Sequence, residues 1–347
     1  MKLYYECNFF DEKFVEKDNF VVTQNELLGK SKISEKKHAF TKLSVSYNCQ
    51  WIKQPDWSNE KPTIIIPIKD SLNLLTITLQ NLKLHNIHTH CNIIIVDDRS
   101  IEDVKGLVLE NKLSYLRVDN DKGFNFSMLN NIPAKICHSL GVKTIILWNS
   151  DLWCVKEEWF LKLLNNHTKD KNVVSGSKLV YPPLSMSLSE DEDTDNIKLH
   201  FPLMKGKWRE TIQFGGDYWV HVPNSPFEYL ALSPLHYGRF KNLEDSRYNC
   251  DRGASFVTGA LQVWDLEHYI KLGGLNPSMS KNFQDVDLCL KVVKLGLPSP
   301  MYYGKDIYFY HDESFSLSNN KNDLQLATDH VIFSKIWNQS MVSLLLS

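Results

Sequence analysis

The sequence predicts an α/β protein with a mostly parallel sheet flanked by helices. From Pro62 onward, short apolar segments alternate with segments of helical periodicity. The apolar segments are hydrophobic throughout, which is typical of parallel strands buried on both faces. Hydrophobic residues make up 43% of the 347 residues, so the chain can bury a sizeable core and is not disordered.

The elements of this sheet follow in order along the chain. The β-branched run 63–68 is too short for a helix and predicts the first strand. By the same signals we expect further strands over 92–96, around 115–118 and over 144–148. Helices are expected over 72–84, after Ser100, over about 127–140, from about 156 to 164, and from about 285 to 296, where Gly296 is a good C-terminal cap. Residues 208–252 predict irregular structure or short antiparallel strands, because they are rich in aromatics, proline and glycine.

Composition excludes several classes of protein. Lys and Arg number 39 against 41 Asp and Glu, so no basic field exists to bind nucleic acid. No apolar run approaches the ~20 residues of a membrane span, and the N-terminus does not resemble a signal peptide. The seven cysteines are scattered, odd in number and without a CxxC pair, which argues against a disulfide framework or a thiolate zinc site. We therefore expect a protein of the reducing cytoplasm.

Polar clusters follow two of the predicted strands. Asp97, Asp98 and Ser100 end the second strand, and the segment 149–151 ends the fourth. Ligands of parallel sheets bind at the carboxyl ends of the strands. Taken alone, the first cluster is equally well explained as a turn with a helix cap. A lone aspartate such as Asp151 could hold Mg²⁺ or Mn²⁺ against a diphosphate, although most loop aspartates have no such role.

Three later features also have two interpretations. The stretch 124–131 opens a helix, where an asparagine or serine cap is the ordinary explanation. Asp285 lies in a first helical turn, where the helix dipole alone favours acids. His311 follows a strand-like run and is either a satisfied histidine or a metal ligand.

The order and spacing of these segments resemble the inverting glycosyltransferases of family 2, which have the GT-A, Rossmann-like nucleotide-binding fold with a smaller mixed region on the acceptor side. The resemblance runs from about Pro62 to Ser314 and is strongest to rhamnosyltransferase-like enzymes of surface-polysaccharide biosynthesis. The matching segments are 67, 96–100, 124–131, 149–151, 211–216, 257–260, 273–276, 285–291 and 311–314.

The resemblance implies roles for individual residues. Those assigned to the nucleotide-sugar are Pro67, Asp97, Asp98, Asn125, Asn130, Asn149 and Ser150. Asp151 matches the last acid of the family's Asp-x-Asp motif, which binds Mn²⁺ or Mg²⁺, and His311 matches a second ligand on the metal side. Asp285 matches the catalytic base. The residues expected on the acceptor side are Trp219, Gln284 and Asp287.

Two departures from the family pattern concern the metal and the base. Asn149 replaces the first acid of Asp-x-Asp, and Gln284 stands where Glu is commonest. Asp285 and Asp287 diverge by about 200° around a helix axis, so only one of them can face the reaction centre.

The implied activity is transfer of a sugar, with inversion, from a UDP-, GDP- or dTDP-linked donor to a hydroxyl of a glycan or other acceptor. Two other functions remain open: a non-catalytic GT-A domain that binds or scaffolds, and a nucleotidyltransferase. The expected organisation is an N-terminal extension over 1–60, a glycosyltransferase domain over 61–315 and a C-terminal helical segment over 316–347. Within the domain, the nucleotide-binding half covers about 61–155 and the acceptor-side half about 156–315.

Overall fold

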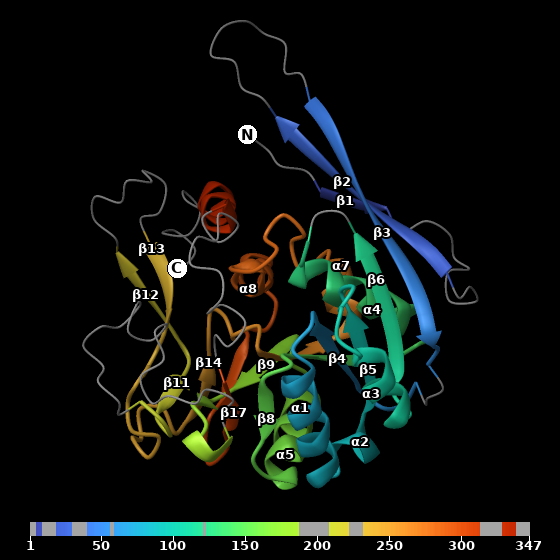
Figure 1. Ribbon diagram of the computed structural model, residues 1–347. Helices are drawn as coiled ribbons and strands as arrows, with labels where there is room; N and C mark the ends of the chain where they lie inside the picture. Colours follow the sequence, from blue (N-terminus) through green and yellow to red (C-terminus); the bar gives the residue numbers. More distant parts are fainter. Residues whose placement is uncertain are drawn as a thin grey trace, which may run out of the picture.

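The computed structural model describes residues 5–8, 19–29, 40–55, 59–120, 123–186, 208–221, 232–312 and 328–337. Within these ranges, one large sheet of eleven strands dominates the fold (Figure 1). Its spatial order is β1 (Tyr5–Asn8), β2 (Asn19–Gly29), β3 (Phe40–Lys53), β6 (Ser114–Asn120), β5 (Asn92–Asp97), β4 (Thr63–Ile68), β7 (Thr144–Trp148), β15 (Leu261–Asp265), β9 (Val174–Ser177), β16 (Met301–Tyr303) and β14 (Asp251–Gly253).

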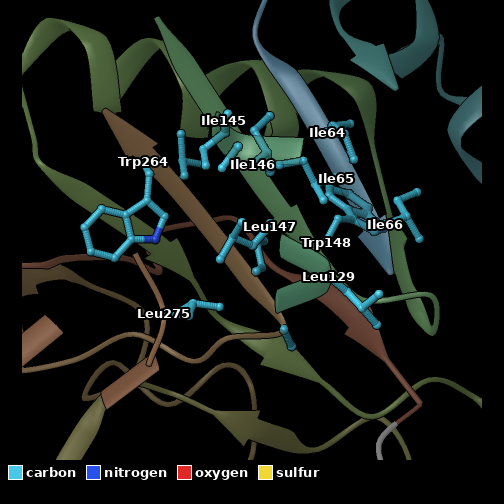
Figure 2. Close-up of a cluster of buried hydrophobic side chains, with 14 of the residues drawn as sticks. Ile64, Ile65, Ile66, Leu129, Ile145, Ile146, Leu147, Trp148, Trp264 and Leu275 are labelled. Carbon is cyan, nitrogen blue, oxygen red and sulfur yellow. The ribbon is translucent and has the colours of Figure 1, made fainter. Parts of the chain in front are cut away.

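The centre of this sheet is parallel. β6, β5, β4 and β7 are paired in parallel, and β15 is antiparallel to both β7 and β9. The strands β4 and β5 are buried at every position, which explains their continuous apolar sequences. Figure 2 shows Ile64, Ile65 and Ile66 of β4 beside the side chains of β7. The predicted α/β class with a Rossmann-like centre is confirmed.

The helices pack against this centre. They are α1 (Leu72–Leu84), α2 (Ile87–His90), α3 (Val104–Glu110), α4 (Phe126–Ser139), α5 (Glu157–Lys169), α7 (Leu266–Lys271) and α8 (Gln284–Lys294), and residues 328–337 are also helical. α4 lies on β4, β5 and β7 and also packs on α7. Its buried face contributes Leu129 to the core (Figure 2).

Two smaller sheets complete the described structure. One has the order β11 (Ile212–Phe214), β10 (Leu179–Val180), β17 (Phe309–His311) and β8 (Leu152–Cys154). The other is a hairpin of β12 (Asp217–His221) and β13 (Leu232–His236), which projects from one side of the molecule (Figure 1). The prediction of short strands in 208–252 is confirmed. In the first small sheet β17 lies beside β8, the strand that follows the central strand β7 in the sequence.

The N-terminal residues extend the large sheet. The hairpin of β2 and β3 pairs along eleven residues, and β3 joins the edge of β6, where Tyr47 lies opposite Asn120. Tyr47, Cys49 and Trp51 of β3 are buried in the main core. The sequence carries no motif that predicts this arrangement, because the strands acquire their partner from β6, some seventy residues later.

Among the described segments, the structure contains no helix whose length and hydropathy would let it cross a bilayer. Six of the seven cysteines are free thiols in the described structure: Cys49, Cys91, Cys137, Cys154, Cys250 and Cys289.

A buried histidine makes the stability of the fold sensitive to pH. His167 of α5 is buried, and its Nδ1 lies 2.9 Å from the hydroxyl of Ser175 in β9. Burial disfavours the charged ring and lowers the pKa of His167 to about 4. The unfolded chain, with a pKa near 6.5, therefore binds more protons than the folded chain between pH 6.5 and 4, so stability is lost as pH falls through this window.

We expect this one group to lower the free energy of unfolding by about 2 kcal/mol between pH 7 and pH 5. Urea denaturation of wild type and His167→Gln at both pH values measures it. The variant should lose less stability than wild type on acidification. Equal losses in the two proteins would show that His167 is not the titrating group.

Candidate active site

Asp98 lies where three parallel strands end. It follows β5, and its Oδ2 is 3.3 Å from the Nζ of Lys69, which follows β4. Asn120, the last residue of β6, donates its amide to Asp98 Oδ1 at 3.0 Å. Burial raises the pKa of Asp98, and the charges of Lys69 and Arg99 oppose that rise. At this edge of the sheet the carboxylate of Asp98 is therefore fully buried and held by neighbouring donors.

The carboxylate oxygens of Asp97 bond to neighbouring protein groups. It accepts the backbone N–H of Ser100 at 2.9 Å and the hydroxyl of Tyr115 at 2.6 Å. Arg117 lies 3.5 Å from the same carboxylate, which is fully buried. Asp97 thus shapes the turn that presents Asp98. Two further residues were expected to bind the nucleotide-sugar. Pro67 lies buried within β4, and the carbonyl of Ser150 accepts a hydrogen bond from the hydroxyl of Thr78.

Asp151 and His311 meet beyond the end of β7. Asp151 precedes β8 and His311 ends β17, two strands that pair antiparallel. The Oδ1 of Asp151 lies 3.1 Å from the Nε2 of His311, and both side chains are about nine-tenths buried. The carbonyl of Asp151 also accepts the backbone N–H of Asp312 at 3.0 Å. Two residues 160 positions apart are thereby fixed in one corner.

The donor atoms of this corner fit a divalent cation. His311 Nδ1 lies 2.7 Å from Gln213 Oε1, which can only accept, so the ring hydrogen is assigned to Nδ1. In the neutral ring Nε2 then directs its lone pair toward Asp151 and toward the side-chain amide of Asn149, 3.3 Å away. The Oδ1 of Asn149 is buried and has no hydrogen-bond partner.

A carboxylate, an imidazole nitrogen and an amide oxygen are ligand types that Mn²⁺ accepts. No group of three or more His, Cys, Asp or Glu side chains suited to a metal occurs in the part of the chain that the structure describes. An ion held here would take its remaining ligands from a diphosphate and water, as Mg²⁺ commonly does. Gln213 would fix the orientation of the imidazole from the second shell of ligands.

Asp285 opens α8 and is half-buried. Its Oδ2 accepts the backbone N–H of Gly259 at 2.6 Å, and its Oδ1 accepts that of Val286 at 2.9 Å. Burial raises the pKa of Asp285, and these two backbone hydrogen bonds oppose the rise. A carboxylate with a raised pKa is a better proton acceptor than an exposed one. We expected the helix dipole to dominate here, but the larger effect on the pKa is desolvation.

One loop connects the carboxylate of Asp285 to the corner formed by Asp151 and His311. Gly259 binds Asp285, and the next residue, Ala260, accepts the backbone N–H of Asn149 at 3.1 Å. A Cβ on Gly259 would come within 3.2 Å of the Asp285 side chain, so glycine permits this close approach. The candidate base and the candidate metal corner therefore border the same short loop.

The side chain of Asn125 forms hydrogen bonds with neighbouring parts of the protein. Its Oδ1 caps α4 through the N–H of Met128, and its Nδ2 donates to the carbonyl of Pro277 at 2.9 Å and to Tyr47. The Nδ2 of Asn130 donates to Phe126, and its Oδ1 is buried without a partner. The beginning of α4 therefore anchors the loop that leads toward α8.

The three residues expected on the acceptor side differ in exposure. Trp219 of β12 is half-buried and donates its Nε1 to the Ser255 hydroxyl at 2.7 Å, close to the loop that binds Asp285. Gln284 is buried, and its Oε1 has no hydrogen-bond partner. Asp287 is fully buried, accepts the Nε1 of Trp337 at 2.9 Å and pairs with Lys291 at 2.8 Å. In this structure Asp287 is enclosed by protein.

Several residues that build the site carry no sequence signal of their own. Lys69, Asn120 and Gln213 contact Asp98 or His311, but each lies at least 22 residues from its partner. Gln213 belongs to the matching segment 211–216, which was the one clue available. Residues 222–231 of the expected acceptor-side half, and the end of the segment 311–314, lie outside the described residues.

Comparison with known proteins adds few constraints. No protein-family model matches the chain. It is 27% identical over 280 residues to the "Uncharacterized protein y4gI" of Sinorhizobium fredii (strain NBRC 101917 / NGR234), covering 79% of this chain. The chain spans about a quarter of that relative, 26% of its length.

Among solved structures, the chain is similar to the "Crystal structure of GalNAc-T7 with UDP, GalNAc and Mn2+". The TM-score is 0.49 and the identity 13%, over 74% of this chain and 45% of that one. A likeness of this size carries no argument about fold or function.

Proposed function

We propose that this chain is an inverting glycosyltransferase that moves a hexosyl group from a nucleotide-diphosphate sugar to a hydroxyl acceptor. The observation that carries the proposal is the shared loop, because Gly259 binds Asp285 while Ala260 binds Asn149 beside Asp151 and His311. A proton acceptor and a cation-binding corner on one loop suit the displacement of a diphosphate by a hydroxyl. The proposed catalytic domain covers about 61–315.

In this proposal the chain's own side chains bind, orient and accept a proton. Asp98 would accept hydrogen bonds from the nucleoside, with Lys69 and Asn120 keeping the carboxylate in place. The acceptor's hydroxyl oxygen would attack the anomeric carbon from the face opposite the nucleotide, and the nucleoside diphosphate would leave. Asp285 would take the proton of this hydroxyl during the attack. A single displacement of this kind inverts the anomeric configuration.

Asp151 and His311, with Asn149, would hold Mn²⁺ or Mg²⁺. When bound, such an ion stabilises negative charge on the departing diphosphate. The resemblance to surface-polysaccharide enzymes favours a glycan acceptor and a UDP-, GDP- or dTDP-linked donor. The six cysteines that the structure describes as free thiols are compatible with the reducing cytoplasm that we propose as its location.

A ligand screen tests the proposal. Thermal unfolding is followed with nucleoside diphosphates and nucleotide sugars, with and without Mn²⁺. A ligand at 100 times its dissociation constant stabilises a protein by about 2.7 kcal/mol, which is readily seen. Donors that stabilise are then assayed for release of the nucleoside diphosphate. Stabilisation without turnover on any acceptor would favour a binding module, and synthesis of a nucleotide sugar from a triphosphate would favour a nucleotidyltransferase.

Replacing Asp98 with alanine should weaken binding of nucleoside and nucleoside diphosphate alike. A hydrogen bond to a charged group contributes about 1.5–3 kcal/mol, and the nucleoside is common to both ligands. Calorimetry on wild type, Asp98→Ala and the control Asp119→Ala measures the effect. Asp119 is a partly exposed carboxylate one residue before Asn120. Unchanged dissociation constants in Asp98→Ala would make Asp98 a turn residue only.

A further inference from the structure

A buried carboxylate from the C-terminal helix holds the loop that leads to α8. Asp329 is fully buried and accepts three consecutive backbone N–H groups. Its Oδ1 accepts that of Ser280 at 3.2 Å, and its Oδ2 accepts those of Lys281 and Asn282 at 2.8 and 3.0 Å. Residues 280–282 lie immediately before Phe283 and α8. An ionised carboxylate suits this role because it only accepts hydrogen bonds.

The residue between this loop and α8 has a strained backbone. Phe283 has φ of 63°, in the left-handed region that side chains with a Cβ rarely adopt. Its ring stacks on Phe333 with centroids 4.9 Å apart and lies 5.3 Å from the ring of His330. Both partners belong to the helix 328–337. These ring contacts therefore stabilise a backbone conformation of Phe283 that is unfavourable by itself.

The helix 328–337 also contacts α8 just after Asp285 in the sequence. The Nε1 of Trp337 donates to Asp287 Oδ1 at 2.9 Å, and Asp287 also pairs with Lys291 one turn later. Figure 1 shows the helix, in red, beside α8. Asp285 thus lies between two anchors, Phe283 and Asp287, that both contact one helix.

The far side of the loop is held by α4. Ser127 donates its hydroxyl to the carbonyls of Asn276 and Met279, and the backbone N–H of Phe126 bonds to Ser280 at 2.8 Å. The loop is therefore fixed between α4 and the C-terminal helix. Gln284, the first residue of α8, also donates its amide to the carbonyl of Lys281 at 3.3 Å.

We infer that Asp329 is a positioning residue for Asp285, and that the helix 328–337 fixes the first turn of α8 for proton transfer. The inference rests on the proposed function, because it presumes that Asp285 is the base. A shift of about 1 Å in a reacting group can lower a rate about 100-fold. In Asp329→Asn, one of the two acceptor oxygens becomes an NH₂ group that cannot accept the loop amides.

The test compares Asp329→Asn with Lys335→Gln, which changes an exposed residue of the same helix. We expect kcat of Asp329→Asn to fall about 10–100-fold while the dissociation constant of the nucleoside diphosphate stays within twofold. Hydrogen exchange at 280–285 should accelerate, whereas exchange in β4 and β5 should not. Lys335→Gln should match wild type in all three measurements.

The outcomes separate this inference from the proposed function. If Asp285→Asn leaves turnover intact, the proposed base is wrong, whatever Asp329 does. If Asp285→Asn abolishes turnover but Asp329→Asn keeps wild-type kcat, the positioning role is wrong. Should Asp329→Asn fail to fold, Trp337→Phe removes the indole N–H donor to Asp287, together with part of the buried ring. It should then lower kcat without changing donor affinity, and a wild-type kcat would overturn the inference.

Discussion

Replacing Asp285 with asparagine should lower the rate of sugar transfer by roughly 10²–10⁴-fold. The amide keeps the size of the side chain, and its oxygen can still accept the Gly259 N–H, but it cannot take a proton. Since the proposed base would act only while the hydroxyl attacks, the loss should appear in kcat, and affinity for the donor should barely change. Steady-state kinetics with calorimetry of the nucleoside diphosphate measure both quantities.

Asp287→Asn is the matched control because the same substitution is made two residues later in the same helix. Asp287 is enclosed between Trp337 and Lys291, so its loss should lower stability more than turnover. The pH dependence gives a second check. Because burial raises the pKa of Asp285, wild-type kcat should fall as pH drops through a range above that of an ordinary aspartate. Near-normal turnover in Asp285→Asn would favour the non-catalytic binding module.

The central strands and helices could be predicted closely because local sequence and burial agree there. The first strand and the following helix were expected over 63–68 and 72–84, and the structure has β4 and α1 with these bounds. A strand that is buried on both faces is hydrophobic along its whole length, so it can be identified in the sequence as a continuous apolar run. The N-terminal strands gave no such signal, because β3 pairs with a strand that lies far along the sequence.

The site could be predicted only as far as its strand ends. Asp98 and Asp151 fall where β5 ends and where β7 gives way to β8, as their sequence context indicated. The partners that determine their chemistry come from distant elements, such as Gln213 behind His311 and Asp329 beneath the loop before α8. Spacing along one chain does not reveal such contacts. Asn125 is the reverse case, since its suggestive position at a helix start turned out to be filled by capping and loop contacts.

Replacing Asp151 with asparagine should remove most of the effect of Mn²⁺ on nucleoside diphosphate binding. In the proposed metal site Asp151 would supply the charged oxygen, whereas His311 and Asn149 would supply neutral ligands. With Asn149 in place of a second acid, a neutral substitution at 151 leaves no negatively charged protein ligand for a divalent ion. Charge stabilisation by a bound metal amounts to several kcal/mol in such reactions, so turnover should fall by roughly 10²–10³-fold as well.

Calorimetry of the nucleoside diphosphate with and without Mn²⁺ decides the point without any assay of transfer. In wild type and in the control Glu158→Gln, an exposed acid on α5, Mn²⁺ should tighten binding. In Asp151→Asn, affinity without metal should match wild type, because the substitution leaves in place Asp98, the residue proposed to bind the nucleoside, and its partner Asn120. Equal tightening by Mn²⁺ in wild type and Asp151→Asn would remove Asp151 from the metal site. The side-chain oxygen of Asn149, which is buried without a hydrogen-bond partner, would then need another explanation.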